Sequence, residues 1–492
     1  MTTKVQVLTI ITLGATLAIA SAQTTQTAQA AAGTPPPPAL SSTEQTIKDI
    51  KNPVSWLSWG ADLRIRDEYF NDMLTLNPTA RKHEQNMIRI RGRLWTSITP
   101  VENLSFNARI ADEVREWTKP AGYTPMAGLT SLDTGRTGLD MREGIIDNLN
   151  AEMKNVGAVP LTIKVGRQDL FLGDGWLVGD GTPFDGSWTY FLDAARLTYD
   201  LKDQHTTFDV IGIMQDGYDD GWLPTINPQH LYLTEQNEKG AIAQIANSSM
   251  KAANLTGYFM YKHDNALNGI PAKYHPDSGD IYTVGGRVNG LLCDNLKYWA
   301  EGAYQFGRKQ DPSVHYPEIV SGYRHMDAFG VNSKLTYMFK DKLNNQLTCS
   351  FELLSGDDPK SNNDEMFDVL WGRWPRWSEI GLYSYAAETR IGQEANLIRF
   401  GPTWTFNPIK DMEFSASYYA LFTMTDVPTR EASPTLFSHN DNFRGHFASA
   451  MLKYKFGPHM NGHLWSEFLF PGEYYAHTTV IPFLRAEVMF TF

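Results

Sequence analysis

The C-terminal segment 481–492 (IPFLRAEVMFTF) alternates between two kinds of position with a period of two. One set is apolar throughout: Leu484, Ala486, Val488, Phe490 and Phe492. The intervening positions are mixed and carry the charges of Arg485 and Glu487. A period of two indicates a β-strand with one apolar face and one polar face. A strand that ends the chain on an aromatic residue of its apolar face is typical of the closing strand of an outer-membrane β-barrel.

Similar alternating segments recur along the chain and are joined by connections of two lengths. Strands are expected at 61–69, 87–99 and 104–115, with a long polar loop at 71–85 and a tight turn at 100–103. Further short turns are expected at 155–159, 202–205, 251–254, 290–295, 341–344, 407–411 and 457–461. Further long connections include 117–141, 170–192, 215–239, 310–325, 355–394 and 423–441. Short periplasmic turns and long extracellular loops are the asymmetry of such barrels.

The pattern predicts an all-β fold: a single antiparallel transmembrane β-barrel with short periplasmic turns and long extracellular loops. Eight short turns and nine long loops give 18 strands, and the weak segments 145–153, 240–247 and 480–483 leave 16 as the alternative. A soluble β-sandwich would also alternate, but its apolar face would not be so consistently aromatic. Two segments show this face: Phe329, Val331, Leu335, Tyr337 and Phe339 in one, and Met412, Phe414, Ala416, Tyr418, Ala420 and Phe422 in the other.

The N-terminal residues 1–22 are expected to be a secretory signal. Lys4 precedes an apolar run, 5–20, that ends in the small residues Ala20-Ser21-Ala22. An N-terminal membrane anchor is the alternative, but the run is shorter than the roughly 20 residues that a spanning helix needs. After Ala22 no run of 18 apolar residues occurs, so a membrane span there must be built from strands. The expected location is the bacterial outer membrane, after cleavage near Ala22.

Residues 23–59 are expected to form a periplasmic tether ahead of the barrel domain, 60–492. Four prolines, 35–38, predict a stiff spacer. Ser41 and Glu44 then have the spacing of a capping box, which predicts a short helix to about Ile50. A leader without a role and a periplasmic docking segment are both compatible with this sequence.

Composition narrows the class of partner. Aromatic residues make up 12% of the chain, which suits the two aromatic girdles of a membrane barrel. A net charge of −12 argues against nucleic acid as a partner. Two cysteines, Cys293 and Cys349, are too few for a disulfide framework.

The strand parity that directs apolar side chains to lipid directs a set of cations into the lumen. A charge on the lipid face would cost about 2–4 kcal/mol near the midplane. The first three strands and the later ones contribute Arg64, Arg66, Arg89, Arg91, Arg93, Arg109, Arg196, Arg287, Arg399, Lys453, Lys455 and Arg485. Acidic residues with the same parity are Glu301, Glu352, Glu413, Glu467 and Glu487.

The arginines of the first three strands are expected to form a one-sided basic wall, because Asp62 and Glu68 are too few to neutralise them. The planar guanidinium fork binds carboxylates in a bidentate manner, so such a wall favours carboxylate-bearing anions. The alternative is a salt-bridge network that braces a large lumen and has no part in transport.

Seven segments carry a resemblance to a known family. They are GADLRIRDEYFN (60–71), IRIRGRLW (88–95), VGRQDLFLGDGWLVGD (165–180), YWAEGAYQFGR (298–308), LLSGDD (353–358), MFDVLWG (366–372) and FPGEYY (470–475). In this order they resemble the alginate-export outer-membrane proteins, which are 18-stranded monomeric barrels with an arginine-rich lumen. The resemblance implies a monomer and a polysaccharide channel.

The resemblance also implies roles for particular residues. Arg89 or Arg91 matches the selectivity arginine of the second strand, and Arg167 with Gln168 matches that of the Gly-Arg-Gln motif. Simple alternation from Val165 would point Arg167 at lipid, so the resemblance implies a bulge or strand end there. The chain departs from the pattern on the strand that enters the Pro-Gly loop, where the exporter has two arginines. Here that strand has His463, Trp465 and Glu467 instead.

Two transport hypotheses remain open. The first is a channel for passage, by expectation export, of an anionic polysaccharide or uronate-type oligosaccharide, driven by a gradient or by a periplasmic export complex. The second is a general or uptake porin for small anions or sugars, in which the same arginines form an electrostatic filter. In either case the inward aromatics Trp95, Trp299 and Trp465 could stack on sugar rings or simply pack in the lumen.

An enzyme and a cofactor are not expected. The histidines fall mostly in loops, among them His83, His230, His275 and His439, and no serine has a nucleophile-like setting. The acidic loop 355–365 has oxygen ligands that suit Ca²⁺ but lacks EF-hand spacing, so a solvated or lumen-gating loop is the favoured interpretation. Trp371, Trp374 and Trp377 follow in the same loop and could fold inward as a constriction.

Overall fold

The computed structural model describes residues 41–80, 83–119, 139–141, 144–179, 192–226, 228, 230, 234, 236–267, 278–310, 323–373, 377–384, 388, 393–428 and 435–492. The expected signal segment, the four prolines of the tether, His275 and Trp374 lie outside the described residues.

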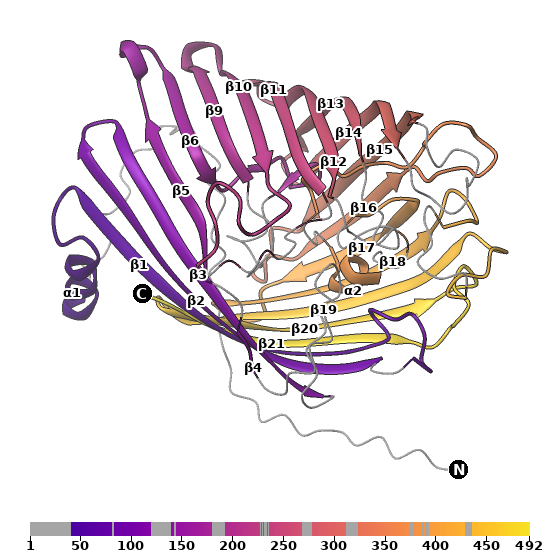
Figure 1. The fold of residues 1–492 in the computed structure, drawn as a ribbon. Coiled ribbons are helices and arrows are strands. Elements are labelled where there is room, and N and C mark those ends of the chain that lie inside the picture. Colours follow the sequence, from indigo (N-terminus) through magenta and orange to yellow (C-terminus); the bar gives the residue numbers. More distant parts are fainter. Residues whose placement is uncertain are drawn as a thin grey trace.

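The described residues form a closed, 18-stranded antiparallel β-barrel (Figure 1), as the connection pattern predicted. The barrel strands are β1 (Leu57–Asn71), β2 (Glu84–Val101), β3 (Leu104–Lys119), β5 (Ile145–Met153), β6 (Leu161–Gln168), β9 (Leu192–Leu201), β10 (Thr206–Gln215), β11 (Gln236–Met250), β12 (Ala253–Ala266), β13 (Ser278–Cys293), β14 (Leu296–Gln310), β15 (Tyr323–Met338), β16 (Gln346–Leu354), β17 (Leu397–Phe406), β18 (Met412–Phe422), β19 (Phe443–Gly457), β20 (Met460–Pro471) and β21 (Ile481–Thr491). The weak segments 145–153, 240–247 and 480–483 lie in β5, β11 and the start of β21, so the alternative of 16 strands is wrong.

Smaller elements accompany the barrel. The short strand β4 (Leu139–Met141) pairs with β3 beyond the end of β5, and β7 (Phe171–Leu172) pairs with β8 (Val178–Gly179) in a separate hairpin. Two α-helices, α1 (Ser42–Lys51) and α2 (Glu379–Ser384), and two 3₁₀ turns at Val156–Ala158 and Lys202–Gln204 complete the described elements.

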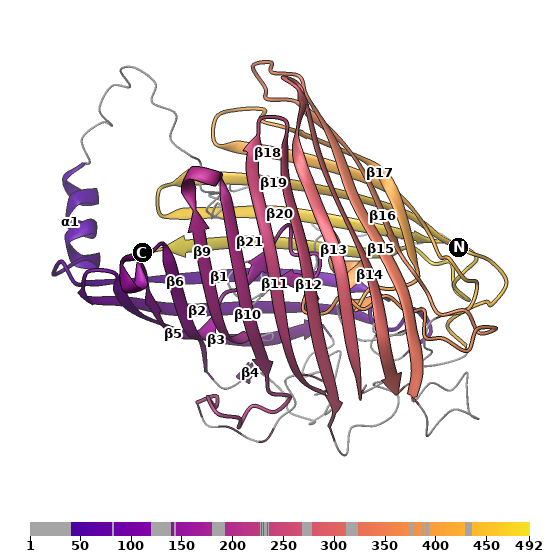
Figure 2. The ribbon, with the colours of Figure 1, turned by 90° about the horizontal axis from the view of Figure 1, so that it is seen from above.

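The barrel closes where β21 pairs with β1. In this register Leu63 lies opposite Phe490, and Glu68 lies opposite Arg485. Leu63 and Phe490 are 44% and 42% exposed, so the apolar face of the last strand points outward as its alternation predicted. Figure 2 shows the β11–β15 wall crossing the β18–β21 wall, as expected of strands that tilt around a barrel.

The short connections gather at one end of the barrel, which the asymmetry of such barrels identifies as the periplasmic end. Tight turns at this end need residues with positive φ, and asparagine, aspartate and histidine tolerate that region best. Asn103, Asn155, His205, Asn344 and Asp411 supply it, with φ of 67°, 52°, 49°, 51° and 63°.

Helix α1 lies at the same end. Its start is as predicted, because the Ser41 hydroxyl accepts a hydrogen bond from the Glu44 amide at 3.2 Å. The Glu44 carboxylate lies 3.1 Å from Nε2 of His459, which is in the turn before β20. Trp59 of β1 donates from Nε1 to the Ile50 carbonyl at 2.9 Å. The end of the tether is therefore fixed to the barrel rim.

The outer face of the barrel is a band of exposed apolar side chains. On β15, Phe329, Val331, Leu335 and Tyr337 are 39–45% exposed, and Phe339 just beyond the strand is 50% exposed. This face matches the lipid-facing set expected from the sequence. Within the described residues, no helix is long and apolar enough to cross a membrane.

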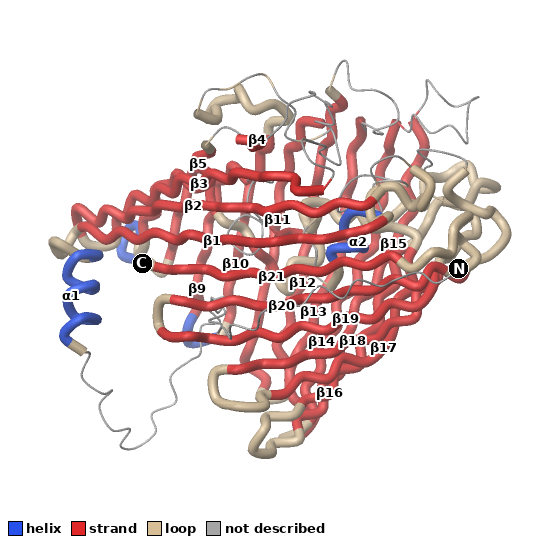
Figure 3. Tube along the Cα trace, turned by 90° about the horizontal axis from the view of Figure 1, so that it is seen from below, coloured by secondary structure: helices blue, strands red, loops and turns tan. Residues whose placement is uncertain are grey.

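Two long connections fold back into the barrel, where their aromatic side chains meet. One is the β7–β8 hairpin, and the other is the segment 355–384, whose helix α2 lies inside the ring of strands in Figure 1 and is the blue helix labelled α2 in Figure 3. The rings of Trp176 and Phe367 stack 5.3 Å apart. Backbone hydrogen bonds join Trp371 to Leu177 and to Gly179, at 2.9 Å and 3.1 Å. The main hydrophobic core of the described chain thus lies within the lumen.

Candidate functional site

The inner wall formed by β1, β2, β3 and β21 carries the arginines that the parity argument directed to the lumen. Arg64, Arg66 and Arg91 are each 1% exposed and Arg485 is 3% exposed. Their apolar neighbours Leu63, Ile65, Ile90 and Leu94 are 41–51% exposed on the opposite face. These arginines lie on adjacent strands of the sheet. We refer to Arg64, Arg66, Arg89, Arg91, Arg93, Arg109 and Arg485 as the arginine wall.

Each side chain of the arginine wall is held by carboxylates. Glu68 accepts hydrogen bonds from Arg89 Nη1 at 3.0 Å and from Arg485 Nε at 2.7 Å. Glu113 accepts from Arg89 Nε at 3.1 Å and from Arg64 Nη2 at 3.3 Å. A guanidinium shared between two carboxylates from different strands is held in position, because N–H groups on two sides of its planar fork are directed at oxygens.

The expectation that Asp62 and Glu68 would leave this wall strongly basic is wrong. Further carboxylates from β3, β5, the β6–β7 connection, α2 and β21 pair with it: Glu113, Asp147, Asp169, Glu379 and Glu487. Glu113 has the same parity as Arg109 on β3, so continued alternation would have found it. Asp169 and Glu379 come from connections, where strand parity gives no information. The wall is a dense mixed network rather than a bare cationic surface.

Arg167 points into the lumen, although simple alternation from Val165 directed it to lipid. Val165 is 52% exposed and Arg167 is 4% exposed, and between them Gly166 has a φ of +119°. A Cβ on Gly166 would lie 2.2 Å from the Leu149 carbonyl oxygen, so this reversal of parity depends on glycine. Arg167 then pairs with Asp193 through Nε–Oδ1 and Nη2–Oδ2 contacts of 2.8 Å and 3.0 Å. Its role in transport stays a prediction.

The other expected lumen residues are placed in separate groups around the barrel. Arg196 makes a bidentate pair with Asp209 at 2.9 Å and 3.0 Å. Nη1 of Arg287 lies 3.6 Å from Oε1 of Glu301. Gln168 donates from Nε2 to the Ala194 carbonyl at 2.9 Å. These residues lie on the inner face of the barrel but are not part of the arginine wall.

Arg399 on β17 connects the inner face of the barrel to the segment 355–384, which folds into the lumen. It pairs with Glu352 of β16 at 2.7 Å, and its guanidinium lies 4.9 Å from the ring centroid of Trp377 and 4.6 Å from that of Tyr419. Trp377 was expected to fold inward, and this contact shows that it does. The cation of Arg399 is thus covered by an aromatic side chain.

Glu467 on β20 anchors helix α2. Its carboxylate accepts hydrogen bonds from the Ser378 hydroxyl at 3.0 Å and from the amides of Glu379 and Ile380 at 3.2 Å and 2.9 Å. A carboxylate in this position satisfies amides at the start of a helix that lack partners within it. Glu379 in turn accepts from Arg485 at 2.7 Å. The residue that departs from the family pattern therefore holds a segment inside the lumen.

The segment 355–373 is fixed to the opposite wall by ion pairs that strand parity could not predict. Asp357 makes a bidentate pair with Arg324 of β15 at 2.8 Å and 2.9 Å. Asp368 lies 2.9 Å from Nζ of Lys309 and 3.5 Å from Nζ of Lys262, and both lysines are fully buried. The segment thus supplies carboxylates to cations on β12, β14 and β15.

A similar contact involves Glu388 and Arg444 of β19, which are joined by two hydrogen bonds of 2.5 Å and 2.8 Å. The Tyr474 hydroxyl, in the β20–β21 loop, donates to Glu388 at 2.9 Å. Burial raises the pKa of this hydroxyl well above its usual value, and the nearby Glu388 carboxylate adds to the shift. The phenol therefore stays protonated and remains a donor.

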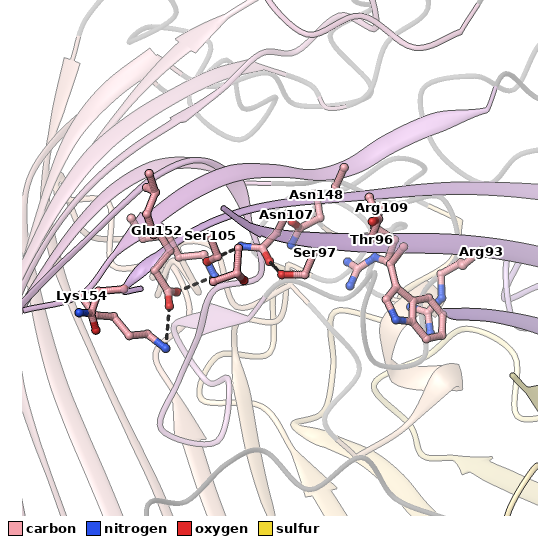
Figure 4. A pocket seen from close by; sticks show the side chains of 15 residues that line it. Arg93, Thr96, Ser97, Ser105, Asn107, Arg109, Asn148, Glu152 and Lys154 are labelled. Atoms are coloured by element: carbon pink, nitrogen blue, oxygen red, sulfur yellow. Dashed lines mark hydrogen bonds and ion pairs between the residues drawn. The ribbon is translucent and has the colours of Figure 1, made fainter. Parts of the chain in front are cut away.

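A cavity of about 790 Å³ opens on the inner wall near the periplasmic turns (Figure 4). Strands β2, β3, β5 and β6 contribute its side chains. Figure 4 shows Glu152 and Lys154 at one end, Arg93 and Arg109 at the other, and Ser97, Ser105, Asn107 and Asn148 between them. Trp95 and Lys164 also line it. Of the residues predicted for the lumen, Arg93, Arg109 and Trp95 thus belong to a defined cavity.

The family is decided by a comparison of the whole chain with family models. The model of the alginate-export family matches residues 55–430, which is more than half of the chain. The chain therefore belongs to the alginate-export family. No curated protein matches the chain.

Solved structures similar to this alginate-export family member are outer-membrane porins at low sequence identity. OccK5 (OpdH) of Pseudomonas aeruginosa is 12% identical, with 88% of this chain and 97% of that chain covered and a TM-score of 0.51. OpdK of the same organism is 10% identical, with 88% and 98% covered and a TM-score of 0.54. A BenF-like porin from Pseudomonas fluorescens Pf-5 is 10% identical, with 88% and 98% covered and a TM-score of 0.52. These likenesses show the fold, and with the family they make the protein a lipid-embedded outer-membrane channel.

Metal binding is a separate question for the acidic loop. Among the residues that the structure describes, no group of three or more His, Cys, Asp or Glu side chains is arranged to hold a metal ion. Asp357 and Asp358 are engaged with Arg324 and with the Lys360 amide. A Ca²⁺ ion in this loop stays a prediction.

Proposed function

We propose that this channel passes an anionic polysaccharide or uronate-type oligosaccharide, in the direction of export. The arginine wall is the observation that carries the proposal. It gathers seven guanidinium groups, each paired with carboxylates, on β1, β2, β3 and β21 in a member of the alginate-export family. A polymer with one carboxylate per sugar residue could engage several of these arginines at once.

Pairing with wall carboxylates makes such a surface suitable for passage rather than for capture. A channel must bind its substrate strongly enough to admit it and weakly enough to release it. A substrate carboxylate that approaches Arg89 competes with Glu68 and Glu113, which already hold that guanidinium. Each contact with the polymer then exchanges a carboxylate of the wall for a carboxylate of the substrate. No arginine therefore binds the polymer so tightly that it cannot be released.

A second candidate function is uptake of small carboxylates or sugars. The observation that favours it is the packing of Trp176, Phe367 and Trp371 inside the barrel, because a filled lumen suits small solutes. One of the structural neighbours is OpdK with vanillate, an aromatic carboxylate. The same arginines would then act as a filter for small anions.

Single-channel recording separates the two candidates. A polyuronate added to the purified protein in a planar bilayer should block the current. A neutral polysaccharide of the same length should block it less, because it has no carboxylates to pair with the arginine wall. Indifference to polyuronate together with ready passage of small sugars or carboxylates would favour the uptake porin. A monomeric state and a periplasmic export complex are further proposals, which crosslinking in cells would test.

A further inference from the structure

The cavity near the periplasmic turns shares Arg93 and Arg109 with the arginine wall, but the rest of its lining has a different chemistry. Its middle is lined by neutral amide and hydroxyl side chains and by one tryptophan. We propose that this cavity is a saccharide-binding shelf that recognises the hydroxyl groups and ring face of a sugar chain, independently of its charge. The proposal rests on the proposed function in taking the ligand to be a saccharide, and it adds a binding site which that function does not require.

The floor of the shelf is a ladder of hydrogen-bonded neutral side chains from three strands. The Ser97 hydroxyl donates to Asn107 Oδ1 at 2.8 Å, and Asn107 Nδ2 donates to Asn150 Oδ1 at 3.1 Å. Asn150 Nδ2 continues the ladder to Asn148 Oδ1 at 2.7 Å. A side-chain amide has two donor hydrogens and an acceptor oxygen with two lone pairs. The ladder therefore holds its side chains in place while offering both donors and acceptors, which is what sugar hydroxyl groups require.

Trp95 supplies a flat apolar surface beside this ladder. Its indole ring lies across Gly60 of β1, where a Cβ would come within 2.7–2.9 Å of three ring atoms. Gly60 and Trp95 are paired in register, so the backbone of β1 supports one face of the ring. The ring also lines the cavity, and its N–H has no hydrogen-bond partner within the described part of the chain. An aromatic surface with a polar edge suits the C–H face of a pyranose with its rim of hydroxyls.

The charged groups at the two ends of the shelf are already paired. At one end, Arg93 Nη2 lies 2.6 Å from Asp62, and Arg109 is held by Asp147 and Asp169 at 2.8 Å and 2.7 Å. At the other end, Lys154 and Lys164 share Glu152, at 3.0 Å and 3.5 Å. Over the two ends together these four cations meet four carboxylates, so the named groups leave no net charge on the shelf. Hydroxyl contacts and stacking therefore decide what binds.

The position of the shelf indicates the stage of transport at which it would bind the sugar chain. It includes Asn103 of the β2–β3 turn and Lys154 of the β5–β6 turn, so it opens at the periplasmic end. A volume of about 790 Å³ falls within the range of about 300–1,000 Å³ that is usual for ligand pockets. A chain entering from the periplasm would meet the shelf before the centre of the arginine wall.

One-sided block in oriented planar bilayers tests the shelf. A neutral linear hexasaccharide and an oligouronate of equal length are added in turn to the periplasmic or the extracellular side of the full-length protein. We expect both to block from the periplasmic side, with a longer residence for the oligouronate because it also meets the arginine wall. Trp95→Ala should shorten the residence of both by about tenfold, and Trp95→Phe, which keeps an aromatic surface, by less. Trp404→Ala, on the outer face of β17, is the matched control and should leave residence unchanged.

The outcomes separate the shelf from the proposed function. Periplasmic block by oligouronate alone, unchanged in Trp95→Ala, would overturn the shelf and leave the polyanion channel standing. Equal residence of the two saccharides in the wild type, with a periplasmic block that Trp95→Ala abolishes for both, would support the shelf and overturn the polyanion channel. An equal effect of Trp404→Ala would show a general loss of barrel integrity and would also overturn the shelf. An Asn107→Ala variant gives the shelf a second test that keeps Trp95 in place.

Discussion

Arg66 on the first strand donates a hydrogen bond from Nε to Glu487 Oε2 on the last strand at 2.8 Å, across 421 positions of sequence. Nη2 of the same guanidinium lies 2.6 Å from that oxygen. Both side chains are almost fully buried on the lumen face. The pair therefore joins the two ends of the chain at the point where the barrel closes, and it does so within the arginine wall.

Removing the carboxylate of this pair should destabilise the closed barrel. In Glu487→Ala, Arg66 loses its closest carboxylate in a buried site, and breaking such a pair typically costs about 3–5 kcal/mol. The measurement is the temperature at which the purified barrel changes from folded to unfolded mobility in detergent gels. Replacing both residues with methionine should restore part of the loss, because it removes the cation that Glu487→Ala leaves behind, while Arg64 and Glu68 each lose one partner. Glu102→Ala, at an exposed position in the β2–β3 turn, should unfold at the wild-type temperature.

The mixed composition of the arginine wall predicts selectivity changes of opposite sign at two neighbouring positions. Arg89→Gln leaves Glu68 and Glu113 with one cation fewer, so anion permeability should fall relative to cation permeability by about twofold. Glu113→Gln should raise it by a similar factor. Reversal potentials in a salt gradient measure both. If the two variants shift the potential in the same direction or not at all, the wall is not the selective part of the pore.

Strand parity was enough to predict which side chains line the barrel, because a residue on a strand has only two faces to choose from. The inward arginines of β1 and β2 followed from a period of two, and the number of strands followed from the alternation of short and long connections. Gly166 shows where this reasoning stops: one residue with positive φ reverses the parity, and only the family resemblance indicated that Arg167 points inward.

The connections could not be predicted in the same way. Asp368 meets Lys309 and Lys262 from a segment without any repeat, and the sequence separation between these groups sets no geometric constraint. The expected shortage of carboxylates on the wall was wrong for the same reason, because Asp169 and Glu379 come from connections. The aromatic residues of this loop were a usable signal, since an exported polar loop has little reason to carry them unless they pack.

Neutralising Asp368 should loosen the segment 355–373 and raise the conductance. Asp368→Asn removes the carboxylate between two buried lysines, which costs about 1–3 kcal/mol or more for a buried group that loses its charged partner. The open-channel current in symmetric salt should then increase or fluctuate more. Lys360→Gln, at an exposed position of the same segment, should leave the current unchanged. Removing residues 359–378 altogether should give a larger increase, and an unchanged current in that deletion would show that the segment does not limit the pore.

The hydrogen bonds between Glu467 and the start of helix α2 can be tested separately, because this helix narrows the lumen beside β20. Glu467→Ala leaves the Ser378 hydroxyl and the amides of Glu379 and Ile380 without their shared acceptor, and loss of a helix cap typically costs about 1–2 kcal/mol. Hydrogen exchange of residues 377–384 should therefore become faster, while exchange in β20 itself stays slow. Glu467→Gln retains one acceptor oxygen and should lie between Ala and the wild type. Glu473→Ala, exposed in the following loop, should have no effect. Unchanged exchange in Glu467→Ala would mean that packing around Trp377 holds α2 without the carboxylate, and that the departure from the family pattern at this strand has another cause.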